Sequence, residues 1–291
     1  MSDQGASCQA VVEASVVAVA GVRSTVRASG PGQAREAVVF LHGNPGSSED
    51  WSGLLSQVGV FARGVAPDMP GYGAADRPAD FEYTIAGYAR HLDGLLSALG
   101  IDRVHLVLHD FGGPWGLRWM SENLSRVASL TLINVGILPD YTWHKYARLW
   151  RVPLVAELSF ATMTRGVFGL LLDRENPKPL PRAFLDRMFK DLNAGTKRAI
   201  LKLYRATSVR SVSSVDLAPK LAGRFPVLVL WGDGDRNLPV RYAAAQRAFF
   251  PAAEVHELAG SGHWPFIDEP EQTARLLVRF LRRAVAGVEM P

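Results

Sequence analysis

The sequence predicts an α/β fold in which a mostly parallel, eight-stranded sheet is flanked by helices and interrupted by a helical lid. Short apolar runs alternate with amphipathic segments along most of the chain, and this alternation is typical of strands joined by helical crossovers. One interval breaks the alternation, because roughly ninety residues without a strand signal separate Val135 from Pro226, far more than an ordinary connection needs.

Eight short apolar segments account for the strands, and the first two of them meet near Gly21. The predicted strands cover residues 11–20, 22–27, 38–41, 64–66, 104–109, 130–135, 226–231 and 255–258. A helical pattern precedes the fifth strand over residues 83–99, and another closes the chain over residues 269–286. Strands that alternate with helices in this way form a parallel sheet.

The long interval reads as a helical lid inserted between two strands of the sheet. It contains amphipathic runs at residues 181–192 and 196–207, and the three prolines of residues 176–181 predict a non-helical hinge. The chain therefore divides into a first core segment at residues 1–136, a lid at residues 137–223 and a second core segment at residues 224–291.

Composition and charge exclude several classes of function. The chain of 291 residues is 48% hydrophobic with a net charge of +4, and it has no basic run of the kind that binds nucleic acid. Its single cysteine, Cys8, rules out an internal disulfide. The apolar stretch at residues 10–22 lacks a basic leader and contains Glu13, and no run is long enough to span a bilayer. We expect a soluble, cytoplasmic protein without nucleic-acid or membrane partners, and the oligomeric state stays open.

The run from Val104 to Gly113 carries the strongest chemical signal. A buried strand ends at His109, Asp110 follows, and Gly112 and Gly113 open a helix. Such a sharp strand-to-helix turn lifts its apex residue out of the sheet beside a helix N-terminus, as in the nucleophile elbow G-x-S-x-G. Here Asp110 takes the apex. An aspartate in this place could also be an ordinary helix N-cap, so its partners decide.

Candidate partners follow later strands. Asp235 lies in Trp-Gly-Asp-Gly-Asp-Arg just past a buried strand, and His263 lies in Gly-Ser-Gly-His-Trp after the last strand. Both stand at carboxyl ends of strands, where open α/β sheets place their sites. His263 would take a proton from water while Asp235 fixes its tautomer. Asp233 could replace Asp235, but the spacing favours Asp235.

The loop after the third strand supplies a candidate oxyanion hole. It reads His42-Gly-Asn-Pro-Gly-Ser-Ser48. In folds built around a nucleophile elbow, the residue after His-Gly and the residue after the nucleophile donate backbone N–H groups to the oxyanion. The predicted donors are therefore Asn44 and Phe111.

These residues together resemble the α/β-hydrolase superfamily over residues 11–286. The run Asp68-Met-Pro-Gly-Tyr-Gly73, followed by Arg77-Pro78, is similar to that superfamily's loop after the fourth strand. The resemblance implies the α/β-hydrolase fold. An aspartate at the elbow is similar to the epoxide hydrolases and haloalkane dehalogenases in particular.

The chemistry of a carboxylate nucleophile narrows the electrophile independently. Attack on an acyl group would form an anhydride, which is a poor route to hydrolysis. Attack on an sp³ carbon that carries an oxygen or halide leaving group forms an ordinary ester. Water activated by His263 can then split that ester at its carbonyl, with the oxyanion hole stabilising the intermediate.

Hydroxyl donors in the lid favour an epoxide. The resemblance to epoxide hydrolases implies two lid tyrosines that protonate the departing oxygen, and Leu203-Tyr-Arg-Ala206 is similar to the segment around the second of them. That assigns Tyr204. For the first, Tyr146 is favoured over Tyr141. The Gly262-His-Trp264 context is also similar to epoxide hydrolases, although lid tyrosines can simply pack on a core with wet hydroxyls.

One feature favours a halide instead. Asn44 resembles the asparagine of haloalkane dehalogenases, but Phe111 stands where those enzymes usually carry a tryptophan, and it has no N–H to give. A lid tryptophan such as Trp143 or Trp150 could substitute. The sequence thus predicts an epoxide hydrolase, with a haloalkane dehalogenase as the alternative and an esterase or lactonase behind both. A ligand receptor would need a broken triad, and every triad position is filled.

The expected substrate is small and apolar, and neither half-reaction requires a cofactor or a metal ion. Tyr141, Trp143, Trp115 and Trp264 are predicted to line the substrate pocket. Further apolar residues could also line it, although helical stripes of such residues often belong to a core: Trp150, Phe160, Met163, Phe168 and Leu171.

Overall fold

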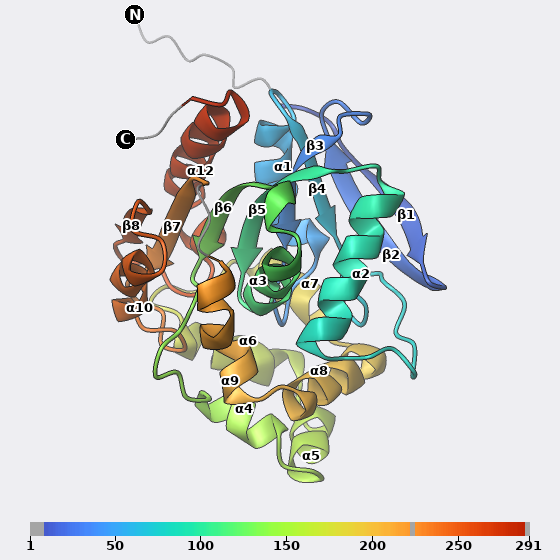
Figure 1. Ribbon diagram of the computed structural model, residues 1–291. Coiled ribbons are helices and arrows are strands. Elements are labelled where there is room, and N and C mark those ends of the chain that lie inside the picture. The colour runs from blue at the N-terminus through green and yellow to red at the C-terminus, as the bar shows by residue number, and fades with distance from the viewer. Residues whose placement is uncertain (1–8, 222–224, 289–291) are drawn as a thin grey trace, which may run out of the picture.

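Eight strands form one sheet in the order β1-β2-β4-β3-β5-β6-β7-β8 (Figure 1). The computed structural model describes residues 9–221 and 225–288, so Cys8 and the predicted lid boundary at residue 223 lie outside the described residues. Strand β2 pairs antiparallel with both β1 and β4, and all other neighbouring strands are parallel. The predicted mostly parallel, eight-stranded sheet is confirmed.

The observed strands begin and end within a few residues of the predicted ones. Their bounds are β1 Val12–Val19, β2 Val22–Ser29, β3 Glu36–Leu41, β4 Arg63–Pro67, β5 Arg103–His109, β6 Val127–Ile133, β7 Val227–Gly232 and β8 Glu254–Leu258. Strands β4, β6 and β7 are buried at every position. Burial of both faces explains why these strands are mostly apolar, and why β7 appears in the sequence as a continuous apolar run.

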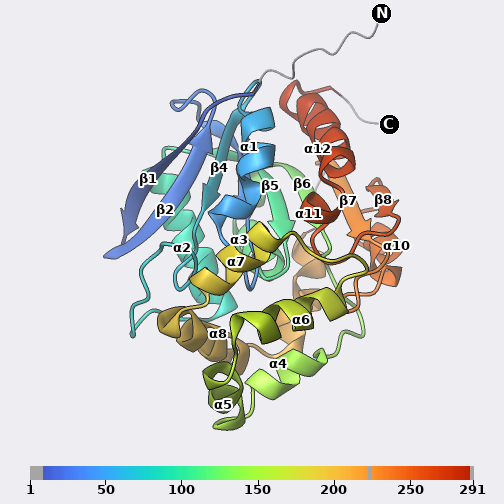
Figure 2. The same ribbon diagram turned by 180° about the vertical axis from the view of Figure 1, so that it is seen from behind.

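Helices cover both faces of the sheet (Figures 1 and 2). Helices α2 and α3 lie on one face, whereas α1 and α12 lie on the other. The bounds of the helices outside the lid are α1 Ser52–Val58, α2 Ile85–Ala98, α3 Gly112–Glu122, α10 Arg241–Ala245, α11 Pro265–Asp268 and α12 Pro270–Val285, with short 3₁₀ helices η1 Ser48–Trp51, η2 Leu124–Arg126 and η4 Gln246–Ala248. Helices α2 and α12 lie where the sequence predicts them.

The long insertion between β6 and β7 is helical and lies beyond the carboxyl ends of the parallel strands (Figure 1). We call its helices the lid helices: α4 Lys145–Trp150, α5 Val155–Ala161, α6 Arg165–Glu175, α7 Arg182–Asp191, α8 Ala194–Ala206, α9 Val209–Val212 and the 3₁₀ helix η3 Val215–Lys220. The proline-rich stretch at residues 176–181 separates α6 from α7 without helical structure, as predicted. The division of the chain at residues 137 and 223 stays our interpretation.

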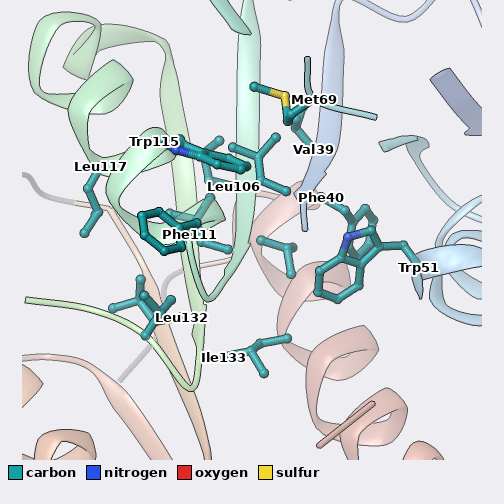
Figure 3. Packing of buried hydrophobic residues seen from close by; sticks show 14 of the residues in the cluster. Val39, Phe40, Trp51, Met69, Leu106, Phe111, Trp115, Leu117, Leu132 and Ile133 are labelled. Atoms are coloured by element: carbon teal, nitrogen blue, oxygen red, sulfur yellow. The ribbon is translucent and has the colours of Figure 1, made fainter. Parts of the chain in front are cut away.

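The sheet is held by one apolar core that reaches the base of the elbow (Figure 3). Phe40 on β3 and Leu106 on β5 are fully buried, and Phe40 packs on Trp51 with ring centroids 5.4 Å apart. Such close packing resists displacement of the strands. The residues that follow these strands are therefore held on a rigid support.

Lid helices α5 and α6 together, but neither one alone, match a membrane-spanning segment in length and composition only. In the part of the chain that the structure describes, no single helix is long and apolar enough to cross a membrane. Helices α5 and α6 pass the test together, but they are bent by 111°.

Candidate active site

Asp110 occupies the turn between β5 and α3 in a left-handed backbone conformation with φ 48°. The turn is possible because its neighbours are small. A Cβ on Gly112 would stand 2.4 Å from the carbonyl oxygen of Leu41, and a Cβ on Gly43 would stand 2.2 Å from the side-chain Cβ of Asp110. Contacts that short are forbidden. The two glycines therefore let the β3 loop and the elbow approach each other, and the Asp110 side chain projects at their junction.

Three side chains meet at the carboxyl ends of β5, β7 and β8. His263 Nε2 lies 3.3 Å from Asp110 Oδ2, and His263 Nδ1 lies 2.7 Å from Asp235 Oδ2. The structure thus brings together the three predicted triad residues. Asp233, the alternative acid, is exposed and instead accepts a hydrogen bond from the backbone N–H of Gly260.

The carboxylate of Asp235 is held on both of its oxygens. Oδ1 accepts hydrogen bonds from the backbone N–H groups of Asn237 and Leu238, at 2.8 and 2.9 Å. Oδ2 accepts from the side-chain amide of Asn134 at 2.7 Å, in addition to His263. A buried carboxylate with this many donors stays ionised and fixed in orientation. Asn134 thus orients Asp235, and nothing in the sequence predicted this role.

A second histidine supports the backbone of the first. His109 Nε2 donates to the carbonyl oxygen of His263 at 2.7 Å. Burial lowers the pKa of His109 to about 3, with the nearby charge of His263 acting in the same direction. His109 is therefore neutral, and its role is to hold the His263 loop in place rather than to carry charge.

Opposing effects set the charges of the triad. Burial alone would lower the pKa of His263, but the Asp235 and Asp110 carboxylates raise it to about 10. Burial would raise the pKa of Asp110, but the hydrogen bond and charge of His263 hold it at about 2. Burial likewise opposes ionisation of Asp235, yet His263 keeps its pKa below the usual value. The resting site is an imidazolium between two carboxylates.

The predicted oxyanion donors differ in what they touch. The backbone N–H of Asn44 donates to Asp110 Oδ1 at 2.6 Å. Among the described residues, Phe111 N–H makes no hydrogen bond to the Asp110 carboxylate, although Phe111 follows Asp110 directly and lines the same pocket. Oδ1 of Asp110 therefore faces the backbone N–H of Asn44, whereas Oδ2 faces His263.

Tyr204 and Tyr141, both buried, have hydroxyls within the electrostatic influence of Asp110. Burial and then the charge of Asp110 raise the pKa of Tyr204 well above its ordinary value. The same two causes raise the pKa of Tyr141 well above its ordinary value. Both phenols are thus protonated and able to donate. The ring of Tyr204 also packs on that of Phe111, with centroids 5.1 Å apart.

Tyr146 points elsewhere. It lines the pocket, but its hydroxyl donates to Glu175 Oε1 at 3.4 Å. Burial and then the charge of Glu175, not of Asp110, raise its pKa. The sequence favours Tyr146 over Tyr141 as the first lid tyrosine that donates a proton. The hydrogen bond of Tyr146 to Glu175 favours Tyr141 instead.

Two pocket residues were missed at the sequence level. His144 lines the pocket, and burial lowers its pKa to about 4, so its ring is neutral. Glu175 lines the same pocket from the end of α6 and is only 8% exposed. His144 carries a weak signal as the N-cap of α4. Glu175 carries none, because its partners Lys145 and Tyr146 lie about thirty residues away in sequence.

Of the predicted tryptophans, two line the pocket and one does not. Trp143 and Trp264 are part of its wall. Trp115 instead belongs to the core, where it is fully buried beside Leu106 (Figure 3) and stacks on Tyr88 with centroids 4.2 Å apart. The assignment of Trp115 to the pocket is therefore wrong, because α3 turns this ring away from the site and toward α2.

The remaining wall of the pocket is largely apolar. It is formed by one polar residue, Asn237, and by Pro45, Pro114, Val135, Leu138, Trp150, Leu172, Val212 and Leu238. Such a wall suits an apolar substrate oriented by a few polar groups. Within residues 9–221 and 225–288, no group of three or more histidine, cysteine, aspartate or glutamate side chains is arranged to hold a metal ion. The site offers a carboxylate nucleophile, a histidine that can move protons, and N–H and O–H donors.

Comparison with protein families agrees with this geometry. A family model described as alpha/beta hydrolase fold matches residues 36–270. An uncharacterised protein of Mycobacterium tuberculosis is 28% identical over 280 residues, covering 90% of this chain and 79% of that protein. A 2-hydroxy-6-oxo-6-phenylhexa-2,4-dienoate hydrolase of Comamonas testosteroni is 27% identical, covering 85% and 88%. A haloalkane dehalogenase of Mesorhizobium japonicum is 27% identical, covering 89% and 86%.

Solved structures share the same fold. A haloalkane dehalogenase from Bradyrhizobium elkani superposes with a TM-score of 0.80 at 23% identity, covering 95% of this chain and 100% of that one. An epoxide hydrolase from Vigna radiata superposes with a TM-score of 0.76 at 21% identity, covering 94% and 98%. At these identities the likeness concerns the fold, and the reaction must be argued from the site itself.

Proposed function

Because the chain belongs to the α/β-hydrolase fold family, we propose that it is a hydrolase that opens epoxides to vicinal diols through a covalent ester on Asp110. One observation carries the proposal: the candidate nucleophile is a carboxylate whose Oδ2 lies 3.3 Å from His263 Nε2, and its charge acts on two buried phenols of the same pocket, Tyr204 and Tyr141. A carboxylate suits attack on carbon, and a phenol suits protonation of a departing oxygen.

The contacts of Asp110 suggest which oxygen attacks. Oδ1 accepts the Asn44 N–H, so it is positioned to become the carbonyl oxygen of the ester. Oδ2 then attacks one epoxide carbon, and the bond from that carbon to the epoxide oxygen breaks. Tyr204, with Tyr141 as its partner, gives a proton to the departing oxygen. The product of this half-reaction is a hydroxyalkyl ester of Asp110 and a tyrosinate.

Ester formation also changes the charge on His263. The Asp110 carboxylate helps to raise the pKa of His263 in the resting enzyme, and esterification removes that charge. The pKa of His263 then falls, and the proton that it releases restores the tyrosine. Neutral His263 can now act as a base, with Asp235 holding its other nitrogen.

The second half-reaction returns the enzyme to its starting state. His263 takes a proton from water, and the oxygen of that water attacks Cγ of Asp110. The oxyanion forms on Oδ1, where the N–H groups of Asn44 and Phe111 are the proposed donors. Collapse breaks the bond between Cγ and Oδ2, and the diol leaves with Oδ2 and a proton from His263. The Asp110 carboxylic acid that remains then gives its proton to His263, which restores the carboxylate and the imidazolium. The sum is epoxide plus water to diol.

A haloalkane dehalogenase is the second candidate, and Asn44 supports it. The side chain of Asn44 lines the pocket and is 7% exposed. Within the described residues its amide nitrogen and oxygen have no partner with hydrogen-bond geometry, although the amide is close enough to the Tyr204 hydroxyl to oppose the rise in the pKa of Tyr204. An unpaired buried amide N–H is a suitable donor to a halide ion. The indole of Trp143 on the same wall could be the second donor.

An oxygen-18 experiment tests the covalent route for both candidates. Excess enzyme is mixed with styrene oxide or 1-bromobutane in H₂¹⁸O, so that each molecule turns over once. The proposal predicts a product without the label and one ¹⁸O in the peptide that contains Asp110. The label in the first product instead would mean that water attacks the substrate directly, and diol formation without bromide release would favour the epoxide over the halide.

A further inference from the structure

A second carboxylate, Glu175, faces the same pocket as Asp110 from the opposite part of the fold. Asp110 follows a strand of the sheet, whereas Glu175 is the last residue of lid helix α6. Glu175 is 8% exposed and lines the pocket. Charged side chains are rarely this buried without a reason. The proposed reaction on Asp110 has no use for it.

The two oxygens of Glu175 have different surroundings. Oε1 accepts hydrogen bonds from Lys145 Nζ at 2.5 Å and from the hydroxyl of Tyr146 at 3.4 Å. Among the described residues, Oε2 has no hydrogen-bond partner, and part of its surface is exposed to solvent. Oε2 is therefore accessible and able to accept a hydrogen bond. The Lys145 side chain is 65% exposed and lies outside the pocket wall, so its charge is hydrated.

Among the described residues that line the Glu175 end of the pocket, the only charged side chain is the carboxylate of Glu175 itself. Within the described residues, no lysine or arginine lines the pocket. His263 is engaged by Asp110 and Asp235, and His144 is neutral. A ligand approaching Glu175 therefore meets a carboxylate set in an apolar wall. Such a group attracts a cation or a hydroxyl donor and repels another carboxylate.

From this arrangement we propose that Glu175 is a specificity-determining residue that accepts a hydrogen bond from a hydroxyl or ammonium group at the far end of the substrate. The substrate class is then a neutral or cationic molecule with an apolar middle, and carboxylate-bearing epoxides are excluded. The inference deepens the proposed function and rests on it for the identity of the reacting group. The binding preference itself can be measured without any turnover.

The test uses three unreactive ligands of matched length: hexylammonium, hexan-1-ol and hexanoate. Binding to the full chain is followed by the fluorescence of the pocket tryptophans, Trp143, Trp150 and Trp264. Since hydrogen bonds to a charged group contribute more than neutral ones, hexylammonium is expected to bind about tenfold more tightly than hexanoate. In Glu175→Gln, which keeps the size of the side chain, this difference should shrink to about twofold.

Three further variants identify the group responsible. Lys145→Met removes the counter-charge and should strengthen the preference for hexylammonium. Glu157→Gln is the matched control, because Glu157 also pairs with a lid cation, Arg205, but does not line the pocket; its preference should equal that of the wild type. Asp110→Asn should also keep the preference. If that variant lost the preference while Glu175→Gln kept it, Asp110 would be the group that attracts cations and the inference would be overturned.

A merely structural role for Glu175 predicts a different pattern. If the carboxylate only ties α4 to α6 through Lys145, then Glu175→Gln should weaken all three ligands alike and lower the melting temperature. That outcome would overturn the inference and leave the oxygen-18 result untouched. Failure of the oxygen-18 experiment would in turn reject the covalent mechanism without changing the order of ligand affinities.

Discussion

The choice between an epoxide and an alkyl halide as the substrate depends on the hydroxyl groups of Tyr204 and Tyr141. Both have pKa values raised by burial and by Asp110, whereas the pKa of Tyr146 is raised by burial and Glu175. A phenol that protonates the departing oxygen should contribute about 10²–10⁴-fold to the rate. Tyr204→Phe should therefore slow formation of the ester from styrene oxide by at least about a hundredfold, measured by stopped-flow tryptophan fluorescence.

The same assay separates the other two tyrosines. Tyr141→Phe should slow ester formation clearly, and Tyr146→Phe should change it less than about threefold, because the Tyr146 hydroxyl bonds Glu175. A larger effect of Tyr146→Phe than of Tyr141→Phe would reinstate Tyr146 as the first lid hydroxyl. Release of bromide from 1-bromobutane needs no phenol as a proton donor. Each of the three substitutions should therefore slow bromide release less than Tyr204→Phe slows epoxide opening.

The charges of the triad predict a different pH dependence for each of the two half-reactions. The pKa of Asp110 is about 2, below its ordinary value, so the nucleophile stays ionised as the pH falls toward the weakly acidic range. Ester hydrolysis needs neutral His263, whose pKa of about 10 falls when Asp110 is esterified. Hydrolysis should thus accelerate with rising pH while ester formation stays nearly constant. Stopped-flow rates between about pH 5 and pH 9 check this, and parallel profiles would contradict it.

At the scale of elements, the start of α3 lies very close to the end of β3. A Cβ on Gly112 would lie 2.4 Å from the carbonyl oxygen of Leu41, whereas nothing lies within 4 Å of one on Gly53 in α1. Gly112→Ala should cost at least about 2 kcal/mol of unfolding free energy by forcing α3 away from the sheet. Gly53→Ala should instead stabilise by up to about 1 kcal/mol. Urea denaturation of both variants checks the contrast, and equal effects would contradict it.

How far the elements could be predicted depended on how local their signals are. Strand β7 is buried at every position, and it appears in the sequence as an uninterrupted apolar run. The elbow is a contiguous run as well, and Asp110, Asp235 and His263 could be found because each lies in the loop that follows a strand. These features need no knowledge of what lies across the fold.

The remaining features depend on contacts between distant segments. Tyr146 could not be separated from Tyr141 because the partner that turns its hydroxyl away, Glu175, lies in another helix. Trp115 was misplaced because its stack on Tyr88 joins α3 to α2. Helical periodicity tells which residues share a face, but it does not tell which neighbour that face meets.

For the whole molecule, the lid is tied to the sheet domain by a partly buried ion pair. Arg187 of α7 lies 2.6 Å from Asp50 of η1, and their side chains are only 18% and 4% exposed. Removing one partner of a buried pair leaves the other charge uncompensated, which costs about 3–5 kcal/mol. Arg187→Met should therefore destabilise the chain by roughly 3 kcal/mol in urea denaturation.

A pair within the lid is the matched control. Arg165 pairs with Asp186, but these side chains are 34% and 64% exposed, so Arg165→Met should cost less than about 1 kcal/mol. If the two variants unfolded at the same urea concentration, the buried pair would not be what holds the lid in place. A second, earlier transition in Arg187→Met alone would show that the lid opens before the sheet unfolds.

The central claim is that Asp110 forms a covalent ester which His263 hydrolyses, and intact-protein mass spectrometry of His263→Ala tests it most directly. This variant keeps the nucleophile and removes the base, so the ester should accumulate. With styrene oxide, the predicted result is a mass increase equal to the whole epoxide, located at Asp110. With 1-bromobutane, an increase equal to the butyl group would establish dehalogenation instead. No adduct from either reagent, in a variant that is folded by circular dichroism, would contradict the account.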